Sequence, residues 1–271
     1  MRILNNVMAF TIYNNMNNHF AKAQKSMLRI ASGQRINSAA DDPAGLAISE
    51  KMRAQIRGLN VAIRNAQDGV SLLQTAEGAV NETHAILQRM RELSVKSANG
   101  TYSESDRQIM QEEIEQLREG LTQIGRDTEF NKQSLLDGSF TDKRIQAGAN
   151  AGQYVDISIG DVRAGALGID EIDISTQEGA DAAIGIVDKA IEQISSQRSN
   201  LGALQNRLEH TINNLYNTVI NLTQAESRIR DADIAKEMML YTKHSLLGQV
   251  AMAMLAQGNQ QPQMILQLLQ N

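Results

Sequence analysis

Side chains able to do chemistry are few in this sequence, and they lie far apart. Cysteine is absent, which excludes thiolate nucleophiles, thiolate metal ligands and disulfide bonds. The imidazoles, which could act as general bases or metal ligands, lie at scattered positions: His19, His84, His210 and His244. Neither a His-Glu-x-x-His motif nor a glycine-rich phosphate loop after a strand occurs. We therefore predict that the chain is not an enzyme and holds no metal and no cofactor.

The acidic pair Asp41-Asp42 is the remaining candidate for chemistry, as a cation site. No further ligands stand at a spacing that would complete a calcium site. The pair precedes Pro43, and an aspartate can cap the free amides of a helix whose first position suits proline. We predict a helix that starts here and runs to about Asn99.

The longest element that this chain must position is a helix around residues 184–229. Its residues at alternating spacings of three and four form one apolar seam, interrupted only by Arg198, Gln205 and Glu226. At the rise of an α-helix the seam is about 70 Å long, so it needs a partner of similar length. We expect the three polar positions to contact a third helix or a neighbouring subunit.

The helix that begins at Pro43 supplies this partner. Its own seam runs from Met52 to Leu87 with the same spacing, and it carries Glu77 and His84 among aliphatic residues. A shorter apolar stripe between about Ser105 and Arg126 predicts a third helix. Together these elements predict an antiparallel α-helical bundle that folds without partners.

Between about residues 140 and 175 the hydrophobic period changes from helical spacing to alternation. Residues 144–148 and 154–159 alternate apolar and polar side chains around the glycine-bounded stretch 148–152. This pattern predicts a small β-hairpin. The fold class we predict is therefore mainly α, a long antiparallel bundle or coiled coil with one small β-hairpin.

The overall composition excludes several classes of protein. Only 3% of the residues are aromatic and the net charge is −5, so nucleic acid is not an expected partner. No apolar run reaches the roughly 18 residues of a membrane span, and the first residues lack the apolar core of a cleaved secretory signal. We expect no membrane insertion, and any export must use a route without such a signal.

Both terminal segments carry apolar stripes that the bundle does not need. The first forty residues and the segment after Ile229 are rich in Met, Asn, Gln and Ala. The first of these helices could dock on the body of its own chain or on other copies, and its sequence leaves both readings open. A two-helix layer with such seams buries little area, which favours folding coupled to self-assembly.

The chain resembles bacterial flagellin from end to end. The motifs that carry the resemblance are Ser32-Gly33-Gln34-Arg35-Ile36-Asn37, Asp41-Asp42-Pro43-Ala44-Gly45-Leu46-Ala47, Gln67-Asp68-Gly69, Gln74-Thr75-Ala76-Glu77-Gly78-Ala79, Leu87-Gln88-Arg89-Met90-Arg91-Glu92-Leu93, Gly148-Ala149-Asn150-Ala151-Gly152-Gln153, Arg228-Ile229-Arg230-Asp231-Ala232-Asp233 and Met254-Leu255-Ala256-Gln257. Only the stretch of about residues 129–174 separates the third helix from the return helix, so the outer domains of larger flagellins look absent.

The resemblance implies a structural subunit that polymerises with copies of itself into the extracellular flagellar filament for motility. It implies export in an unfolded state through a type III-like channel, with an export apparatus, a secretion chaperone, a filament cap and hook-junction proteins as partners. It also implies that residues 1–42 and 230–271 form an inner coiled-coil layer, and that residues 43–229 form the outer tube.

Two sets of site residues follow from this resemblance. A host flagellin-sensing Toll-like receptor is an implied partner, and the positions that match its contacts are Arg89, Leu93 and Glu113. We expect the assembly contacts at Ile12, Met16, Phe20, Met27, Ile30, Arg35, Asn37, Leu247, Val250, Met254, Leu255, Leu268 and Leu269.

Two alternative functions remain beside this one. The hook–filament junction protein shares flagellin-like termini but usually lacks the full set of middle-bundle motifs found here. An intracellular coiled-coil scaffold, or a needle component of an export apparatus, would account for the heptads but not for the hairpin.

Overall fold

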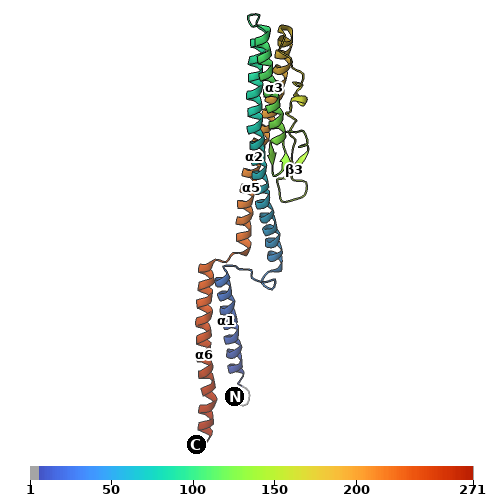
Figure 1. Ribbon diagram of the computed structural model, residues 1–271. Coiled ribbons are helices and arrows are strands. Elements are labelled where there is room, and N and C mark those ends of the chain that lie inside the picture. The colour runs from blue at the N-terminus through green and yellow to red at the C-terminus, as the bar shows by residue number, and fades with distance from the viewer. Residues whose placement is uncertain (1–5, 271) are drawn as a thin grey trace. The chain divides into compact units, whose positions relative to one another are not determined.

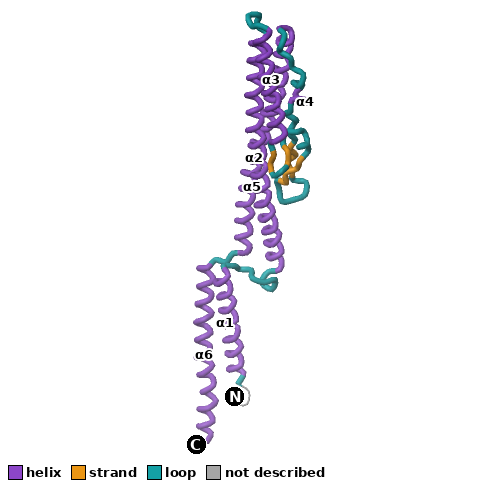
Figure 2. Tube along the Cα trace, viewed as in Figure 1, coloured by secondary structure: helices purple, strands orange, loops and turns teal. Residues whose placement is uncertain are grey.

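The computed structural model describes residues 6–270, and the side chains of residues 6–260. Its elements are α1 (Val7–Ser32), α2 (Pro43–Ser97), α3 (Glu104–Asp127), β1 (Glu129–Phe130), β2 (Gln133–Ser134), β3 (Lys143–Gln146), β4 (Tyr154–Ile157), α4 (Ala164–Leu167), α5 (Gln177–Arg230) and α6 (Ile234–Gln270). The predicted fold class is confirmed, since long helices dominate and the strands form two small antiparallel pairs (Figures 1 and 2).

The chain divides into two compact units. The middle unit spans Gln55–Ile220, and the terminal unit combines the residues up to Ala54 with those from Asn221 onward. Helices α2 and α5 therefore each contribute to both units. Within the described part, no helix is both long enough and apolar enough to cross a lipid bilayer.

In the middle unit, α2 and α5 are antiparallel partners. Arg91 on α2 pairs with Asp188 near the start of α5 at 2.6 Å, whereas Glu77, earlier on α2, accepts a hydrogen bond from Gln205, later on α5, at 2.9 Å. The two seams face one another, and their apolar residues join the same buried core. The predicted intrachain partner of the long seam is confirmed.

Two of the three polar interruptions of the α5 seam, Gln205 and Glu226, contact α2. Gln205 reaches Glu77, which is the polar position of the α2 seam, and Glu226 accepts from Arg53 on α2 at 2.8 Å. Of the two expected contacts, the one with the third helix is not formed by these two side chains, and the one with a neighbouring subunit stays a prediction. A buried polar group needs a polar partner, and the partner helix supplies one at the matching level of each seam.

The third layer of the middle unit is α3 with the segment that follows it. Ser103 and Asp106 form a reciprocal capping box at the start of α3, and Ile114 and Leu121 face the core. The side-chain amide of Gln111 donates a hydrogen bond to the carbonyl of Ile172 and accepts one from the amide of Ile174. The short helix α4 and the pair β1–β2 lie in this region, and neither was predicted.

The predicted hairpin is the pair β3–β4, in the register Lys143↔Ile157 to Gln146↔Tyr154. Its alternation is as expected, because Val155 and Ile157 are buried while Tyr154 and Asp156 face solvent. The hairpin packs closely against α2 at Gly69. A Cβ at this position would stand 2.5 Å from Cδ1 of Ile145 on β3, so only glycine leaves enough room.

In the terminal unit, α1 ends eight residues before the expected limit of about residue 40 because Gly33 adopts the left-handed conformation, with φ 68°. The next helix begins at Pro43 as predicted, and Gly45 donates its amide to Oδ1 of Asp42 at 2.9 Å. Helix α6 runs from Ile234 to Gln270 and includes Pro262.

Candidate assembly surface

Helices α1 and α6 lie side by side and antiparallel in the terminal unit (Figure 1). Asn6 donates to the carbonyl of Gly258 at 3.2 Å, and at the other end of the pair Arg29 contacts Glu237. Small residues let the helices approach, because a Cβ at Gly248 would meet the ring of Phe20 at 3.1 Å. The ring of Phe20 on α1 therefore packs directly against the backbone of α6 at Gly248, where a larger residue would not fit.

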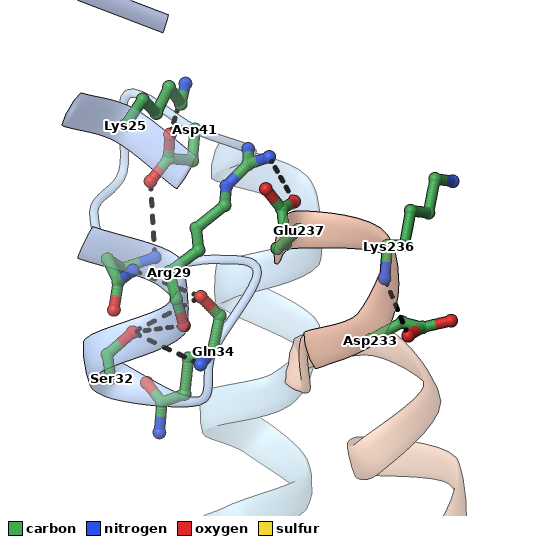
Figure 3. A network of polar contacts seen from close by, with 9 residues as sticks. Lys25, Arg29, Ser32, Gln34, Asp41, Asp233, Lys236 and Glu237 are labelled. Atoms are coloured by element: carbon green, nitrogen blue, oxygen red, sulfur yellow. Dashed lines mark hydrogen bonds and ion pairs between the residues drawn. The ribbon is translucent and has the colours of Figure 1, made fainter. Parts of the chain in front are cut away.

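One ion pair joins the two helices near the junction with the middle helices. Nη1 of Arg29 lies 3.0 Å from Oε1 of Glu237, and both side chains are largely shielded from solvent (Figure 3). The start of α6 beside it is capped by Asp233, whose carboxylate accepts from the amide of Lys236 at 3.1 Å. Shielding strengthens such a pair, and loss of either partner would leave a buried charge.

The loop between α1 and α2 is organised around Asp41. One carboxylate oxygen of Asp41 lies 2.6 Å from the Lys25 ammonium group (Figure 3). The other accepts hydrogen bonds from the amides of Asn37 and Ser38 at 3.2 and 3.3 Å. The Lys25 contact above all, with these amides, lowers the pKa of Asp41 from 3.8 to about 2, although partial burial acts in the opposite direction. The carboxylate therefore fastens the loop to the last turns of α1.

This geometry predicts an acid-sensitive contribution to the stability of the terminal unit. Because the pKa of Asp41 is lower in the folded chain, its contribution is present above about pH 4 and is lost as the pH falls to about 2. For the filaments that the resemblance to flagellin implies, we expect the dissociation temperature of the wild-type chain to exceed that of Asp41→Asn at pH 6, and most of this difference to be lost at pH 2. Light scattering during heating measures both temperatures.

The matched control for this prediction is Asp68→Asn, which removes an exposed carboxylate from α2 in the middle unit. It should leave the dissociation temperature nearly unchanged at both values of pH. A gap between wild-type and Asp41→Asn filaments that stays constant from pH 6 to pH 2 would contradict the role given to the Asp41 carboxylate.

The return of the chain from α5 to α6 is tied to the loop that follows α1. The amide of Arg35 donates to the carbonyl of Arg230 at 2.7 Å, and its guanidinium donates to the carbonyl of Ile229. The amide of Ala232 donates to the carbonyl of Gly33 at 2.9 Å. These backbone contacts set where α1 and α6 start to run together.

The outer faces of α1 and α6 are apolar and exposed. In α1 only Ala23 and Ser26 are buried, whereas Val7 is 70% exposed and Phe10 67% exposed. On α6, Met239 is likewise 67% exposed. The other large apolar side chains exposed on these two helices are Met8, Tyr13, Phe20, Met27, Leu28, Ile234, Met238, Leu246, Leu247, Val250, Met252 and Met254. Large apolar side chains exposed in this number on two neighbouring helices mark a site of association.

The residues predicted for assembly fall into three groups in the structure. Exposed side chains on α1 and α6 are Phe20, Met27, Leu247, Val250 and Met254. Partly buried side chains at the α1–α6 contact are Ile12, Met16, Ile30 and Leu255. Leu268 and Leu269 lie on the helix α6, but their side chains are outside the described residues.

The two polar residues of that prediction, Arg35 and Asn37, already have partners within the chain. Arg35 binds the end of α5, and Asn37 donates its amide to Asp41 and its side chain to the carbonyl of Gln34 at 3.1 Å. They shape the loop that joins α1 to α2. An assembly contact at either residue stays a prediction.

The ion pair of Arg29 with Glu237 and the network of contacts around Asp41 were not predicted from the sequence. A charged residue beside an apolar stripe was the only available signal. The pairing itself depends on contact between residues 208 positions apart in the chain, which periodicity does not reveal.

The residues predicted to contact the host receptor lie on α2 and α3 of the middle unit. Arg89 bonds Glu113 across the two helices at 2.8 Å, so the structure brings these two side chains together at the surface. Leu93 is only 2% exposed and belongs to the core beneath them. The side chain of Leu93 supports the packing of α2, and its receptor contact stays a prediction.

Comparison with known proteins agrees with the fold. Residues 3–141 match the bacterial flagellin N-terminal helical region, and residues 184–269 match the bacterial flagellin C-terminal helical region. The flagellin of Bacillus subtilis strain 168 is 50% identical, and the match covers 99% of this chain and 100% of that protein. The flagellin of Halalkalibacterium halodurans is 51% identical over the same shares of the two chains.

A solved structure supports the same assignment. The crystal structure of Bacillus cereus flagellin is 30% identical, with a TM-score of 0.50 over 56% of this chain and 88% of that chain. Among the functions considered from the sequence, these matches favour the filament subunit over a junction protein or an intracellular scaffold. This chain belongs to the bacterial flagellin family and is a structural subunit of the flagellar filament.

Proposed function

We propose that this subunit of the extracellular flagellar filament polymerises through the outer faces of α1 and α6. The observation that carries the proposal is the apolar surface of these helices, on which side chains such as Phe10 and Met239 are each 67% exposed. Burying one such side chain is worth about 1.5–3 kcal/mol, so association with other copies has a large driving force.

From the exposed apolar surface of α1 and α6 we also infer how the subunit divides between the inner and outer layers of the filament. Residues 1–42 and 230–271 form the inner coiled-coil layer, and residues 43–229 form the outer tube. The second part has a core of its own, with fully buried residues such as Leu87, Ile114 and Ile194. A unit with its own core can fold before assembly, whereas the terminal helices need neighbouring copies to cover them.

Export and capping require terminal helices that are only weakly stable before assembly. A segment that buries only Ala23 and Ser26 along α1 unfolds at little cost, which suits passage through a narrow type III-like channel. The partners proposed for this stage are an export apparatus, a secretion chaperone, a filament cap and hook-junction proteins. The subunit's role is structural, and we propose no catalytic activity for it.

The middle unit is also the proposed contact for a host Toll-like receptor that senses flagellin. Arg89 and Glu113 offer a paired cation and anion on the exposed surface of α2 and α3, with Leu93 below them. Recognition of this surface needs a receptor that replaces the intrachain ion pair with contacts of its own.

Electron microscopy tests the polymerisation proposal directly. The concentrated, purified chain is expected to form tubes of constant diameter without any other protein. Aggregates without helical order, or a chain that stays monomeric at high concentration, would count against the proposal.

Coupled folding of the termini predicts a difference in amide exchange between monomer and filament. In dilute monomer the amides of residues 7–32 should exchange rapidly, while those of the middle unit stay protected. In filaments both sets should be protected. Hydrogen exchange with mass spectrometry measures this, and strong protection of residues 7–32 in the monomer would contradict it.

A further inference from the structure

Methionine is the side chain of this subunit that peroxides oxidise most readily. Cysteine is absent, so no thiolate competes for the oxidant. The thioether of methionine takes up one oxygen atom and becomes a sulfoxide, which turns a flexible apolar side chain into a polar one. The positions of the twelve methionines therefore determine which parts of the subunit a peroxide modifies.

The accessible methionines lie on the two helices of the candidate assembly surface. Among the described side chains, every exposed methionine belongs to α1 or α6, and each is at least 48% exposed. In the middle unit, by contrast, Met90 is 0% exposed and Met110 is 6% exposed, and both belong to the core cluster. The exposed set, which we call the terminal methionines, consists of Met8, Met27, Met238, Met239, Met252 and Met254.

This contrast holds whether or not α1 and α6 are paired in the unassembled subunit. Side chains that are exposed on the paired helices stay exposed when the helices separate. Met90 and Met110 stay covered in both cases, because the middle unit has a core of its own. A peroxide therefore reaches the terminal methionines first and leaves the core intact.

The chemical step is the transfer of one oxygen atom from the peroxide to sulfur. A sulfur–oxygen bond forms while the oxygen–oxygen bond of hydrogen peroxide breaks, and water leaves. The sulfur is oxidised and the peroxide is reduced. The sulfoxide oxygen accepts hydrogen bonds but the group donates none, so its burial against an apolar face of another copy leaves it without a partner.

We propose that the terminal methionines are an oxidation site, at which a peroxide prevents an unassembled subunit from joining the filament. This inference rests on the assembly role proposed for α1 and α6. Conversion of the thioethers to sulfoxides makes the surface that must be buried polar, while the middle unit keeps its fold. The modification is reversible, because methionine sulfoxide can be reduced again to the thioether.

The first test compares two portions of one monomer preparation. One portion is treated with hydrogen peroxide and freed of it before assembly. Peptide mass spectrometry should find sulfoxide at the terminal methionines and intact thioether at Met90 and Met110. The treated portion should need about tenfold more subunit to form filaments, as measured by light scattering.

The possible failures of this test have different meanings. Equal assembly of the treated and untreated portions would overturn the oxidation proposal, and so would equal oxidation of Met90 and the terminal methionines. An untreated portion that does not assemble would instead contradict the assembly role of α1 and α6.

A variant separates the terminal methionines from the rest of the chain. Replacing all six by leucine keeps the surface apolar and nearly conserves its volume, so this variant should assemble equally well before and after peroxide treatment. The control variant Met90→Leu/Met110→Leu should remain as sensitive to peroxide as the wild-type chain. Equal sensitivity of the sixfold variant and the wild-type chain would show that inhibition arises elsewhere.

Enzymatic reduction of the oxidised wild-type chain decides the matter even if the sixfold variant does not assemble. Two methionine sulfoxide reductases, one for each sulfoxide epimer, together restore the thioether. The reduced subunit should regain the assembly of the untreated portion. If mass spectrometry shows restored thioethers and assembly is still lost, the sulfoxides are not the cause and the proposal is wrong.

Discussion

Removal of every residue after Gln257 is expected to abolish filament formation while leaving the middle unit folded. The deletion shortens α6, which runs to Gln270, and removes the carbonyl of Gly258 that receives the side chain of Asn6. It therefore takes away one end of the α1–α6 pair and part of the surface proposed to contact other copies. The core of the middle unit contains no residue of this segment.

Two measurements check this outcome. Electron microscopy of the concentrated truncated chain should show no tubes, and the far-ultraviolet circular dichroism of its monomer should remain close to that of the full chain. Removal of Asn271 alone is the control, and it should leave polymerisation intact. If the chain that ends at Gln257 still forms filaments of normal diameter, α6 does not have the assembly role proposed for it.

Ile194→Ala is expected to lower the free energy of unfolding of the middle unit by about 3 kcal/mol. Ile194 is 0% exposed and lies on the seam of α5, among the residues of the core cluster. The substitution removes buried methyl groups and leaves a cavity that a packed helical core fills only in part. Urea unfolding of the monomer, followed by circular dichroism, measures the change.

The same helix provides a matched control. Ile220→Ala makes the identical chemical change at a side chain that is 53% exposed, and its effect on monomer unfolding should stay within about 0.5 kcal/mol. Equal losses from the two variants would mean that burial along the seam of α5 does not determine the stability of the middle unit.

Local features of the fold were predictable from sequence because they depend on neighbours in the chain. The start of α2 is an example, since Asp42 caps the helix and Pro43 occupies its first position. The β3–β4 hairpin is another, because alternation at Val155 and Ile157 is a pattern of adjacent residues. The pairing of the α2 and α5 seams was predictable because their lengths and spacing match.

The ends of elements were less predictable. Helix α1 stops at Ser32, although its apolar spacing alone does not require it, because Gly33 turns into the left-handed conformation. The pair β1–β2 and the helix α4 are only two to four residues per element, which is too short for a periodic signal. Their positions follow from packing against α3 and not from their own pattern.

Candidate site residues divide in the same way. The apolar faces of α1 and α6 were predictable, because their spacing and the absence of a partner in the bundle are both visible in the sequence. The partners of the polar side chains were not predictable from the sequence. Glu226 was expected to contact α3 or a neighbour and contacts Arg53 on α2, and Leu93 proved to be buried in the core.

The sequence by itself determined the helices, the hairpin, the long intrachain seam and membership of the flagellin family. Only the tertiary structure decided which distant side chains meet, including Arg29 with Glu237 and His19 with His244. The physical reason is that these contacts depend on the register and rotation of two antiparallel helices. Apolar spacing shows which face of each helix is used, but it does not set the level at which the two faces touch.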